Sequence, residues 1–353
     1  MFDACARTTE LIVGERKIRA YLPSIRQLRV RVGQQDDRTT DPQYFIATHT
    51  LEERRVAAVL IRLNHELEAC VLLYELRRHR VGLGILRLGD YVGESLIISP
   101  EEFRAQYVHL AAQVLLRHRT FHGLSLTIKA SLADCVQLMG PENKYRTFSE
   151  RSTAHLLPLE KTYEAMLAAM GPRTRRSLAG KRRQLEMSRN IVFSPLLEPA
   201  QALEVMLALQ PTSLPNRVTR FYQARYRLLL ENPEFFSMGI RLPDGTWLSI
   251  LSGWRRNRVT YVDLQMNDVH FKKESISAVM RAFMLEHEIA CRQELINFVG
   301  GCSLLLRRYC QPVEVCTDVF LWRRCLRATL FRLMTPREKL RSIYERVESP
   351  LGG

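Results

Sequence analysis

An order of predicted elements that occurs twice along the chain limits the folds it can adopt. Each half holds three short apolar runs separated by polar turns, then an amphipathic helix, then a further apolar run. Each half therefore predicts a twisted sheet with a helix packed against it. This places the chain in the α/β (α+β) class, with mixed sheets flanked by helices. A length of 353 residues suits two such units at about 150 residues each.

The first half contains a predicted helix start as well as its strands. Ser99 can cap a helix, Pro100 suits the first helical position, and Glu102 completes a capping box. We therefore expect a helix from this point to about Leu115. The strands expected in this half are residues 56–62, 69–76, 82–88 and 124–128.

The second half gives stronger turn signals. Asp244 and Gly245 predict one tight hairpin, and Arg256 and Asn257 predict the next. A helix is expected over residues 275–292. The strands expected in this half are residues 235–242, 246–254, 258–266, 295–299 and 315–322.

Four segments follow from this order. We expect an N-terminal unit over residues 1–157 and an Arg-rich linker with helices over 158–195. A second unit is expected over 196–334, followed by a C-terminal helix and tail over 335–353. A cleft in the second unit is the expected place for chemistry.

The chain is strongly basic. Its 52 Lys and Arg residues against 37 Asp and Glu residues give a net charge of +15 and a pI near 9.7. Such a surface attracts phosphorylated cofactors, nucleic acid or acidic lipid headgroups, and charge alone does not choose among them. The linker is the densest basic segment, which is either a solvated face or an anion-binding one. Its basic residues are Arg173, Arg175, Arg176, Lys181, Arg182, Arg183 and Arg189.

Composition also indicates a globular, cytoplasmic protein. Hydrophobic residues make up 46% of the chain, which excludes disorder as its main state. The eight cysteines form no Cys-x-x-Cys pair, so we expect reduced thiols and no metal site. The first residues lack the apolar core of a leader, and no apolar run reaches the length of a membrane span.

The linker carries the most specific motif of the chain. Tyr163 to Met170, Arg173 to Leu178 and Lys181 to Glu186 resemble the signature of the BioF2-like, or CelD-like, acetyltransferase family. That family belongs to the GNAT superfamily and is related to the FemAB peptidyltransferases. The order of strands and helices on both sides also resembles a tandem GNAT arrangement, so the resemblance extends over roughly residues 18–330.

This resemblance implies two GNAT-like folds and acyl transfer from acetyl-CoA or another acyl-CoA to an amine or a hydroxyl. The acceptors of the family are often linked to the cell envelope or to polysaccharides. By position, Tyr261 to Met266 resembles the central strand that faces acceptor and thioester. Ser275 to Ser277 resembles the start of the helix that faces the pyrophosphate. Asn297 to Gly301, with Tyr309 after it, resembles the glycine-ending strand and its basic run.

Two departures from the family pattern concern the donor site. The segment from Lys272 to Ser277 contains no glycine, although the superfamily's pyrophosphate loop is glycine-rich. Leu304 to Leu306 stand where the family usually has an aromatic residue and a lysine. The departures favour a degenerate fold kept as a binding module as one alternative.

The candidate catalytic residues lie on and just after one predicted strand. Acyl transfer needs a base for the acceptor's proton, and His270 beside Asp268 is the best candidate. Tyr261, Asp263 and Gln265 alternate along the strand and are expected to share one face, which is either the cleft or a solvent-exposed surface. We take Tyr261 as a catalytic candidate, and Asp263 and Gln265 as substrate-binding candidates. Further substrate-binding candidates are Gly300, Gly301 and Tyr309.

The cofactor-binding candidates surround the start of the predicted helix at 275. Phosphates are favoured at a helix N-terminus, where main-chain N–H groups are free. For Ser275 a helix cap is the favoured interpretation, and the two lysines are equally a solvated pair. The donor-binding candidates are Lys272, Lys273, Ser275, Ser277, Arg175 and Arg176.

Other chemistries lack their motifs. A serine-hydrolase elbow, a phosphate loop and a dinucleotide fingerprint are each missing a required glycine. His287 and Cys291 lack the second pair that a zinc site needs. No nucleic-acid-binding motif occurs, but a FemAB-like transfer from aminoacyl-tRNA remains an alternative that would give the basic surface a partner.

Overall fold

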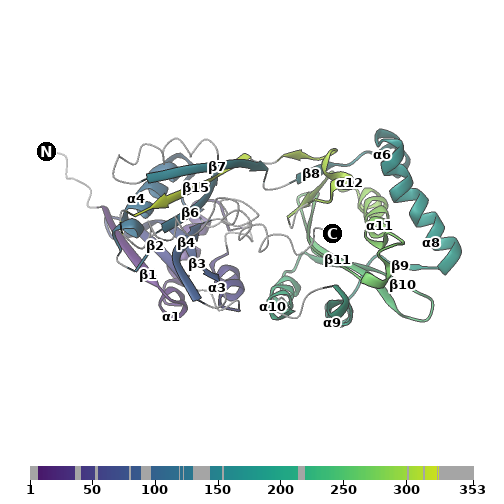
Figure 1. The fold of residues 1–353 in the computed structure, drawn as a ribbon, viewed down its shortest axis with the longest axis horizontal. Helices are drawn as coiled ribbons and strands as arrows, with labels where there is room; N and C mark the ends of the chain where they lie inside the picture. The colour runs from purple at the N-terminus through teal and green to yellow at the C-terminus, as the bar shows by residue number, and fades with distance from the viewer. Residues whose placement is uncertain are drawn as a thin grey trace. The chain divides into compact units, whose positions relative to one another are not determined.

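The computed structural model describes residues 7–35, 41–51, 55–78, 81–88, 97–118, 120–121, 123–129, 144–152, 155–213, 219–299, 302–312, 315–323 and 325. The chain forms two compact units. Unit 1 comprises Met1–Thr153 with Glu314–Gly353, and unit 2 comprises Ala154–Val313 (Figure 1). The expected helix and tail at 335–353 and the candidates Gly300 and Gly301 lie outside the described residues.

Unit 1 is built on a mixed sheet in the order β1-β2-β3-β4-β6-β15-β7, with β5 paired to β3. The first four strands are antiparallel neighbours, whereas β4 and β6 run parallel from Ile85 opposite Gly123 to Leu88 opposite Leu126. The strands are β1 (Arg7–Val13), β2 (Val56–Leu63), β3 (Glu66–Arg78), β4 (Val81–Leu88), β5 (Ile97–Ile98), β6 (Gly123–Lys129), β7 (Lys144–Ser152) and β15 (Val315–Trp322).

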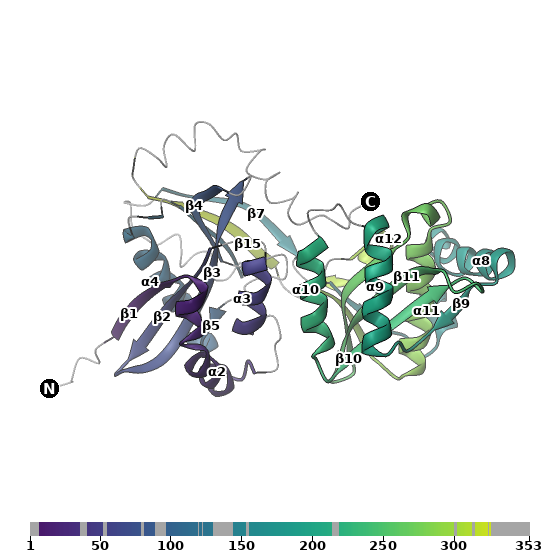
Figure 2. The same cartoon turned by 90° about the horizontal axis from the view of Figure 1, so that it is seen from below.

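Helices cover both faces of this sheet. Figures 1 and 2 show α4 on one face and α2 and α3 on the other. The predicted capping box is not formed: Ser99 lies before a 3-10 turn, its hydroxyl is buried without a partner, and α4 begins at Arg104. The helices are α1 (Glu15–Arg19), α2 (Leu22–Arg31), α3 (Pro42–Leu51), the 3-10 turn η2 (Glu101–Phe103) and α4 (Arg104–Arg117).

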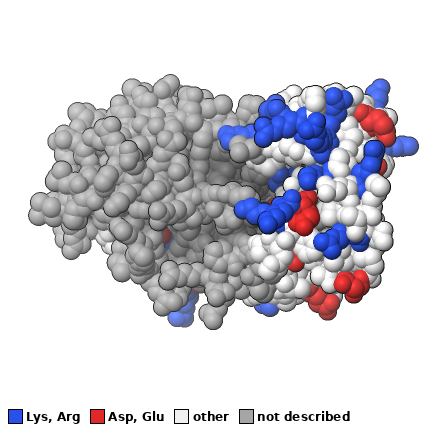
Figure 3. Space-filling view, turned by 45° about the vertical axis from the view of Figure 1, so that its right-hand side comes forward, with Lys and Arg blue, Asp and Glu red and all other residues white. Residues whose placement is uncertain are grey.

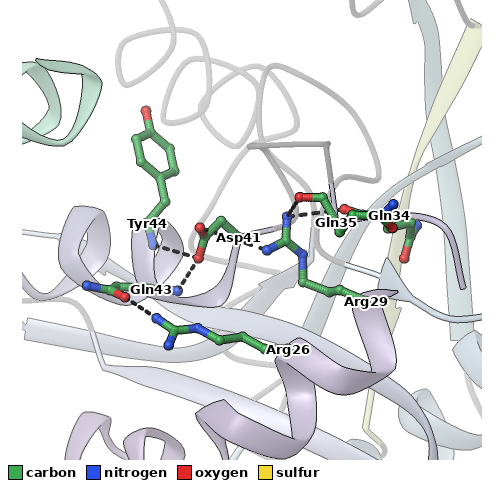
Figure 4. Close-up of polar contacts among 7 residues, drawn as sticks. All are labelled: Arg26, Arg29, Gln34, Gln35, Asp41, Gln43 and Tyr44. Atoms are coloured by element: carbon green, nitrogen blue, oxygen red, sulfur yellow. Dashed lines mark hydrogen bonds and ion pairs between the residues drawn. The ribbon is translucent and has the colours of Figure 1, made fainter. Parts of the chain in front are cut away.

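Polar contacts of Arg29 and Asp41 join α2 to α3 (Figure 4). Arg29, which is 7% exposed, donates to the carbonyl oxygens of Gln34 and Gln35 at 3.1 and 3.2 Å. Its Nη1 lies 3.8 Å from Asp41, whose carboxylate also accepts from the main-chain N–H of Gln43. Asp41 therefore caps α3 and also pairs with Arg29, so these contacts have a structural role.

Unit 2 is built on a second mixed sheet, in the order β14-β8-β13-β12-β11-β10-β9. Among these pairs, β12 and β13 run parallel and the others antiparallel. The strands are β8 (His155–Pro158), β9 (Val192–Ser194), β10 (Phe235–Arg241), β11 (Trp247–Arg256), β12 (Val259–Asn267), β13 (Leu295–Phe298) and β14 (Gln311–Pro312).

The two faces of this sheet carry different helices (Figures 1 and 2). On one face, Tyr226 of α10 hydrogen-bonds to Ser252 of β11 at 2.8 Å. On the other face, α11 packs on the sheet and the helices α6 to α8 pack on α11. The helices are α6 (Tyr163–Ala169), α7 (Pro172–Arg175), the π-helical turn η3 (Arg176–Gly180), α8 (Lys181–Arg189), α9 (Pro199–Ser213), α10 (Thr219–Leu230), the 3-10 turn η4 (Val269–Phe271), α11 (Ile276–Ala290) and α12 (Leu304–Arg307).

The division of the chain differs from the expected boundaries in two respects. Strand β15 was expected in the second unit, but it lies between β6 and β7 in the sheet of unit 1, where Val319 and Leu321 join the core. The segment expected as a linker belongs to unit 2, because Leu178 and Leu185 are buried against α11. In both cases burial of apolar side chains decides the membership.

Candidate active site

The neighbouring parallel strands of unit 2 pair over only part of their length. Strand β13 pairs with β12 from Leu295 opposite Val259 to Phe298 opposite Val262. The main-chain N–H of Val299 then donates to the carbonyl of Val262 at 3.1 Å. Strand β12 continues to Asn267, so its part beyond Val262 is paired with no described residue of β13. Main-chain polar groups at a strand edge that has no partner strand can bond to a ligand.

A β-bulge lies where this pairing ends. Ser252 is opposite Leu264, whereas Gly253 is opposite Val262, so Asp263 is the extra residue of β12. The bulge needs Gly253: a Cβ on this residue would lie 1.7 Å from the carbonyl oxygen of Tyr261. Bulges increase the local twist of a strand.

The bulge overturns the predicted alternation of polar residues. The side chains of Thr260, before the bulge, and Gln265, after it, both hydrogen-bond to residues of α11. Five positions separate them, and in a regular strand residues at this odd spacing would lie on opposite faces. Tyr261 therefore faces the other side of the sheet from Gln265, where its ring stacks on Trp254 with centroids 5.0 Å apart. Tyr261 and Gln265 do not share a face, because the extra residue shifts the two-residue period.

Gln265 is the centre of a polar cluster on the α11 side. Its Nε2 donates to the carbonyl of Ser277 at 3.2 Å and lies 3.3 Å from the Ser277 hydroxyl and 3.1 Å from Oδ1 of Asn267. Its Oε1 accepts from Nε of Arg281 at 3.1 Å. Gln265 and Asp263 are each 8% exposed. The cluster thus links the far part of β12 to the first two turns of α11.

Arg281 is an unusual residue for its surroundings. It lies within an apolar stripe of α11, and desolvation lowers its pKa while the neighbouring thiols of Cys302 and Cys310 act in the opposite direction. Gln265 is its hydrogen-bond partner, and within the described residues no carboxylate pairs with it. A poorly solvated guanidinium with unused N–H donors is suited to an anionic or carbonyl-bearing ligand.

The start of α11 has the features of an anion site and one opposing feature. Ser275 is the N-cap in a left-handed conformation, with φ 59°, and its side chain makes no capping bond. Ser275 therefore leaves N–H groups of the first turn for another acceptor. Lys272 and Lys273 are exposed just before it. The carboxylate of Glu274, however, has a buried oxygen without a partner in the same turn.

The proposed base lies in the turn between β12 and α11. The side chain of His270 is exposed, in η4. Asp268 accepts from the main-chain N–H of His270 at 2.9 Å, so this bond caps η4 and does not orient the imidazole. The two residues lie together as expected, but the bond between them is a turn contact.

Tyr309 holds the linker helices to the segment after β13. Its hydroxyl accepts from the main-chain N–H of Gly171 at 2.8 Å and donates to Oγ1 of Thr174 at 3.2 Å. Arg308 also donates to Thr174. A hydroxyl with these partners anchors α7 to α12.

The Arg-rich helices lie over α11. Arg182 faces inward, donating to Glu186 at 2.9 Å and to Glu286 of α11 at 2.7 Å, with its guanidinium 3.9 Å from the centroid of the Phe283 ring. Arg175 and Arg176 are exposed, and Figure 3 shows Lys and Arg gathered over the visible face of unit 2. Within the described residues, several exposed arginines of these helices pair with no carboxylate. They are Arg173, Arg175, Arg176, Arg183 and Arg189.

Two further buried oxygens lie on β13 and on the segment that follows it. Oδ1 of Asn297 on β13 and Oγ of Ser303 before α12 are buried without a hydrogen-bond partner among the described residues. Buried polar atoms are nearly always paired, so groups of this kind mark places where a ligand or water completes the bonding.

Arg281 and the two orphaned oxygens were not predicted from the sequence. The signal available was an arginine inside the apolar stripe of a helix, between Met280 and Phe283. A charged residue at such a position needs a local partner or a function.

Comparisons with known proteins find structural likeness without sequence likeness. No family description and no curated protein matches the chain by sequence. FemX is 10% identical, with 92% of this chain and 99% of FemX covered, at a TM-score of 0.53. The likeness to FemX concerns the fold, which in this chain is two mixed sheets flanked by helices. A conserved protein of unknown function from Bacteroides thetaiotaomicron VPI-5482 is 11% identical, with 86% and 97% covered and a TM-score of 0.50.

A third match, a tandem GNAT protein from the clavulanic acid biosynthesis pathway, is 10% identical and covers 89% of this chain and 98% of its own, at a TM-score of 0.47. At these identities the likeness concerns the fold. Among the described residues, no helix has both the length and the hydropathy that a bilayer span requires. The described residues also contain no cluster of three or more His, Cys, Asp or Glu able to hold a metal ion.

Proposed function

We propose that this chain is an acyltransferase that moves an acyl group from acetyl-CoA or another acyl-CoA to an amine or hydroxyl. The observation that carries the proposal is the end of the β12–β13 pairing at a β-bulge, on the strand that leads to the uncapped start of α11. A thioester bound there meets main-chain groups of the strand edge, and its diphosphate meets a helix N-terminus.

The donor's phosphates have several cationic candidates. Lys272 and Lys273 precede the free N–H groups of the first turn of α11, and Ser277 lies in that turn. Arg175 and Arg176 are exposed on helices packed against α11. In our proposal these side chains take the place of the close main-chain contacts that a glycine-rich loop would give.

Transfer by direct attack then assigns roles to few residues. The acceptor attacks the thioester carbonyl, the bond from carbonyl carbon to sulfur breaks, and the thiolate of CoA leaves. His270 is our candidate for the group that takes the acceptor's proton. Arg281, held by Gln265, is our candidate donor to a carbonyl or anionic group of the substrates. We give Tyr261 a packing role, because its ring stacks on Trp254 on the other face.

The finer family assignment rests on the linker. The segment from Tyr163 to Glu186 resembles the BioF2-like, or CelD-like, signature, and we propose an envelope-related or polysaccharide-related acceptor on that basis alone. We also propose a cytoplasmic location, on the basis of the reduced cysteines expected from the sequence.

The test is calorimetric titration of acetyl-CoA into the full chain. We expect saturable binding that weakens when Lys272 and Lys273 are both changed to Ala. Arg16→Ala with Lys17→Ala on α1 serves as the control with the same loss of charge in unit 1. Release of CoA with mixed amine and sugar acceptors should be followed by chromatography, since the chain's own thiols react with thiol reagents. No binding by a folded protein would overturn the proposal.

A second candidate is transfer from aminoacyl-tRNA. The exposed arginines without carboxylate partners on α7 to α8 favour it, as does the likeness to FemX at the level of fold. Aminoacyl-tRNA charged with a labelled amino acid, offered in parallel with acyl-CoA, separates the two donors. Donor binding without any transfer would instead support the degenerate, non-catalytic alternative.

A further inference from the structure

Two cysteines flank α12 in unit 2. Sγ of Cys302 lies 3.6 Å from Sγ of Cys310, and both side chains are half-buried. The thiol of Cys310 also lies 3.4 Å from the carbonyl of Leu306. Both are free thiols. The short helical turn of α12 thus brings together two sulfurs that are eight residues apart in the chain.

Their surroundings make the two thiols unequal. The hydrogen bond from Cys302 and the charge of Arg281 lower the pKa of Cys310, against the effect of burial. The same hydrogen bond and burial raise the pKa of Cys302. Cys310 is therefore the thiol that ionises first, while Cys302 keeps its proton and donates it to the neighbouring sulfur. A cation beside a thiolate is the usual setting of a reactive cysteine.

We infer that Cys302 and Cys310 form a thiol–disulfide exchange site for a small-molecule disulfide, with Cys310 as the attacking residue and Cys302 as the resolving one. The thiolate of Cys310 attacks one sulfur of the small disulfide, whose S–S bond breaks and releases one thiol. Cys302 then loses its proton and attacks Sγ of Cys310, which breaks the mixed disulfide and releases the second thiol. Two protein thiols are oxidised by two electrons, and one small disulfide is reduced to two thiols.

The geometry requires little movement for this reaction. A disulfide has an S–S distance of ~2.05 Å, so the sulfurs must approach by about 1.5 Å from their separation of 3.6 Å. The bond would close a loop around α12 and remove the thiolate beside Arg281. The inference does not depend on acyl transfer, since its readout is the state of the two sulfurs.

The sequence makes the product easy to detect. Arg307 and Arg308 lie between the two cysteines, so trypsin separates them, and a Glu-specific protease cutting after Glu294 and Glu314 removes the nearby Cys316. The full chain is held at graded ratios of oxidised to reduced glutathione, quenched with acid, alkylated and digested. We expect residues 295–307 and 309–314 to appear as one disulfide-linked species. Both thiols staying fully alkylated at ratios where the exposed Cys291 carries glutathione would overturn the inference.

Single variants test the order of attack. Cys302→Ser should leave a stable glutathione adduct on Cys310, and Cys310→Ser should leave Cys302 unmodified, whereas Cys291→Ser should still give the linked peptides. Arg281→Met should slow alkylation of Cys310 at pH 7 several-fold. A Cys302 adduct in Cys310→Ser that forms as fast as the Cys310 adduct would contradict the assigned order. The wild-type experiment decides the existence of the pair even where a variant fails to fold.

Discussion

Arg255 of β11 and Glu288 of α11 form a two-point ion pair, with Nε 3.0 Å from Oε2 and Nη2 2.7 Å from Oε1. Thr260 of β12 donates to the same carboxylate, and the Arg255 guanidinium lies 4.2 Å from the centroid of the Phe236 ring. The side chain of Glu288 is fully buried. The pair thus fixes α11 against the two strands that lead to the bulge.

Removal of Glu288 should destabilise unit 2 severely. In Glu288→Ala the guanidinium of Arg255 and the hydroxyl of Thr260 lose a partner in a poorly solvated site, which costs about 3 kcal/mol or more. Urea unfolding followed by circular dichroism measures this change. Arg258→Ala is the matched control, because the Arg258–Glu294 pair is 61% and 57% exposed and should contribute under about 1 kcal/mol. Equal losses for the two variants would contradict the assignment.

Gly253→Ala should disrupt the bulge. A Cβ there would lie 1.7 Å from the carbonyl oxygen of Tyr261, which is main chain and cannot turn aside. We expect a loss at or above the upper end of the ~1–3 kcal/mol range for overpacking, with weaker donor binding in the calorimetric titration. Gly180→Ala is the control, since its Cβ would meet nothing closer than 3.5 Å within a helical turn. That variant should gain about 0.5–1 kcal/mol. Normal stability in Gly253→Ala would show that the bulge can rearrange.

The sequence predicted the elements of the fold well where periodicity decides them. The strands near 56, 235 and 315 and the helix after 275 occur close to their expected limits. Membership of a sheet was harder to predict, because β15 pairs with strands more than 150 residues earlier in the chain. A strand's period shows which side chains share a face, but it contains no information on which partner strand covers its edges.

The position of the candidate site along the chain was predictable from the sequence. The arrangement of its side chains was less predictable. Residues near Lys272 and Ser275 do lie at the start of α11, since a helix start is a local feature. The predicted face of Tyr261 was wrong because Asp263 is an extra residue in β12. An extra residue interrupts the two-residue period, so side chains before it lie on the opposite face from the one that counting back from Gln265 predicts. The pairing of Gln265 with Arg281 joins residues 16 apart through the packing of a helix on a strand. Such a contact has no sequence signature beyond a charged residue in an apolar stripe.

Stability should fall steeply in alkali because of Tyr226. Burial raises the pKa of Tyr226 to about 12 from an ordinary 10.0, with hydrogen bonds from Ser237 and Ser252 acting the other way. Below pH 10 the phenol is neutral in both states. Between pH 10 and 12 only the unfolded chain loses the proton, so the free energy of unfolding falls by about 1.4 kcal/mol per pH unit.

Tyr226→Phe isolates this contribution. The variant loses the 2.8 Å hydrogen bond to Ser252 and should be less stable at pH 8 by about 1 kcal/mol. It should also lack the part of the alkaline decline that Tyr226 supplies, so the two unfolding curves converge as the pH rises from 9 to 11. Urea titrations at half-unit steps give the comparison. Parallel declines would mean that other groups cause the alkaline loss.

The exposed arginines of the linker helices should matter for donor binding in a salt-dependent way. Arg175→Ala with Arg176→Ala removes two charges that the fold does not use for ion pairs, so stability should change little. If each charge contributes up to about 1 kcal/mol to a phosphate contact, donor affinity should fall roughly 2- to 30-fold at low salt. The difference should shrink at 0.5 M salt, where screening acts over a few ångströms. Arg227→Ala on α10, on the other face of the sheet, removes one charge, serves as the control and should leave affinity unchanged. Donor affinity that is unaltered by the double change at every salt concentration would place the phosphates away from α7 and η3.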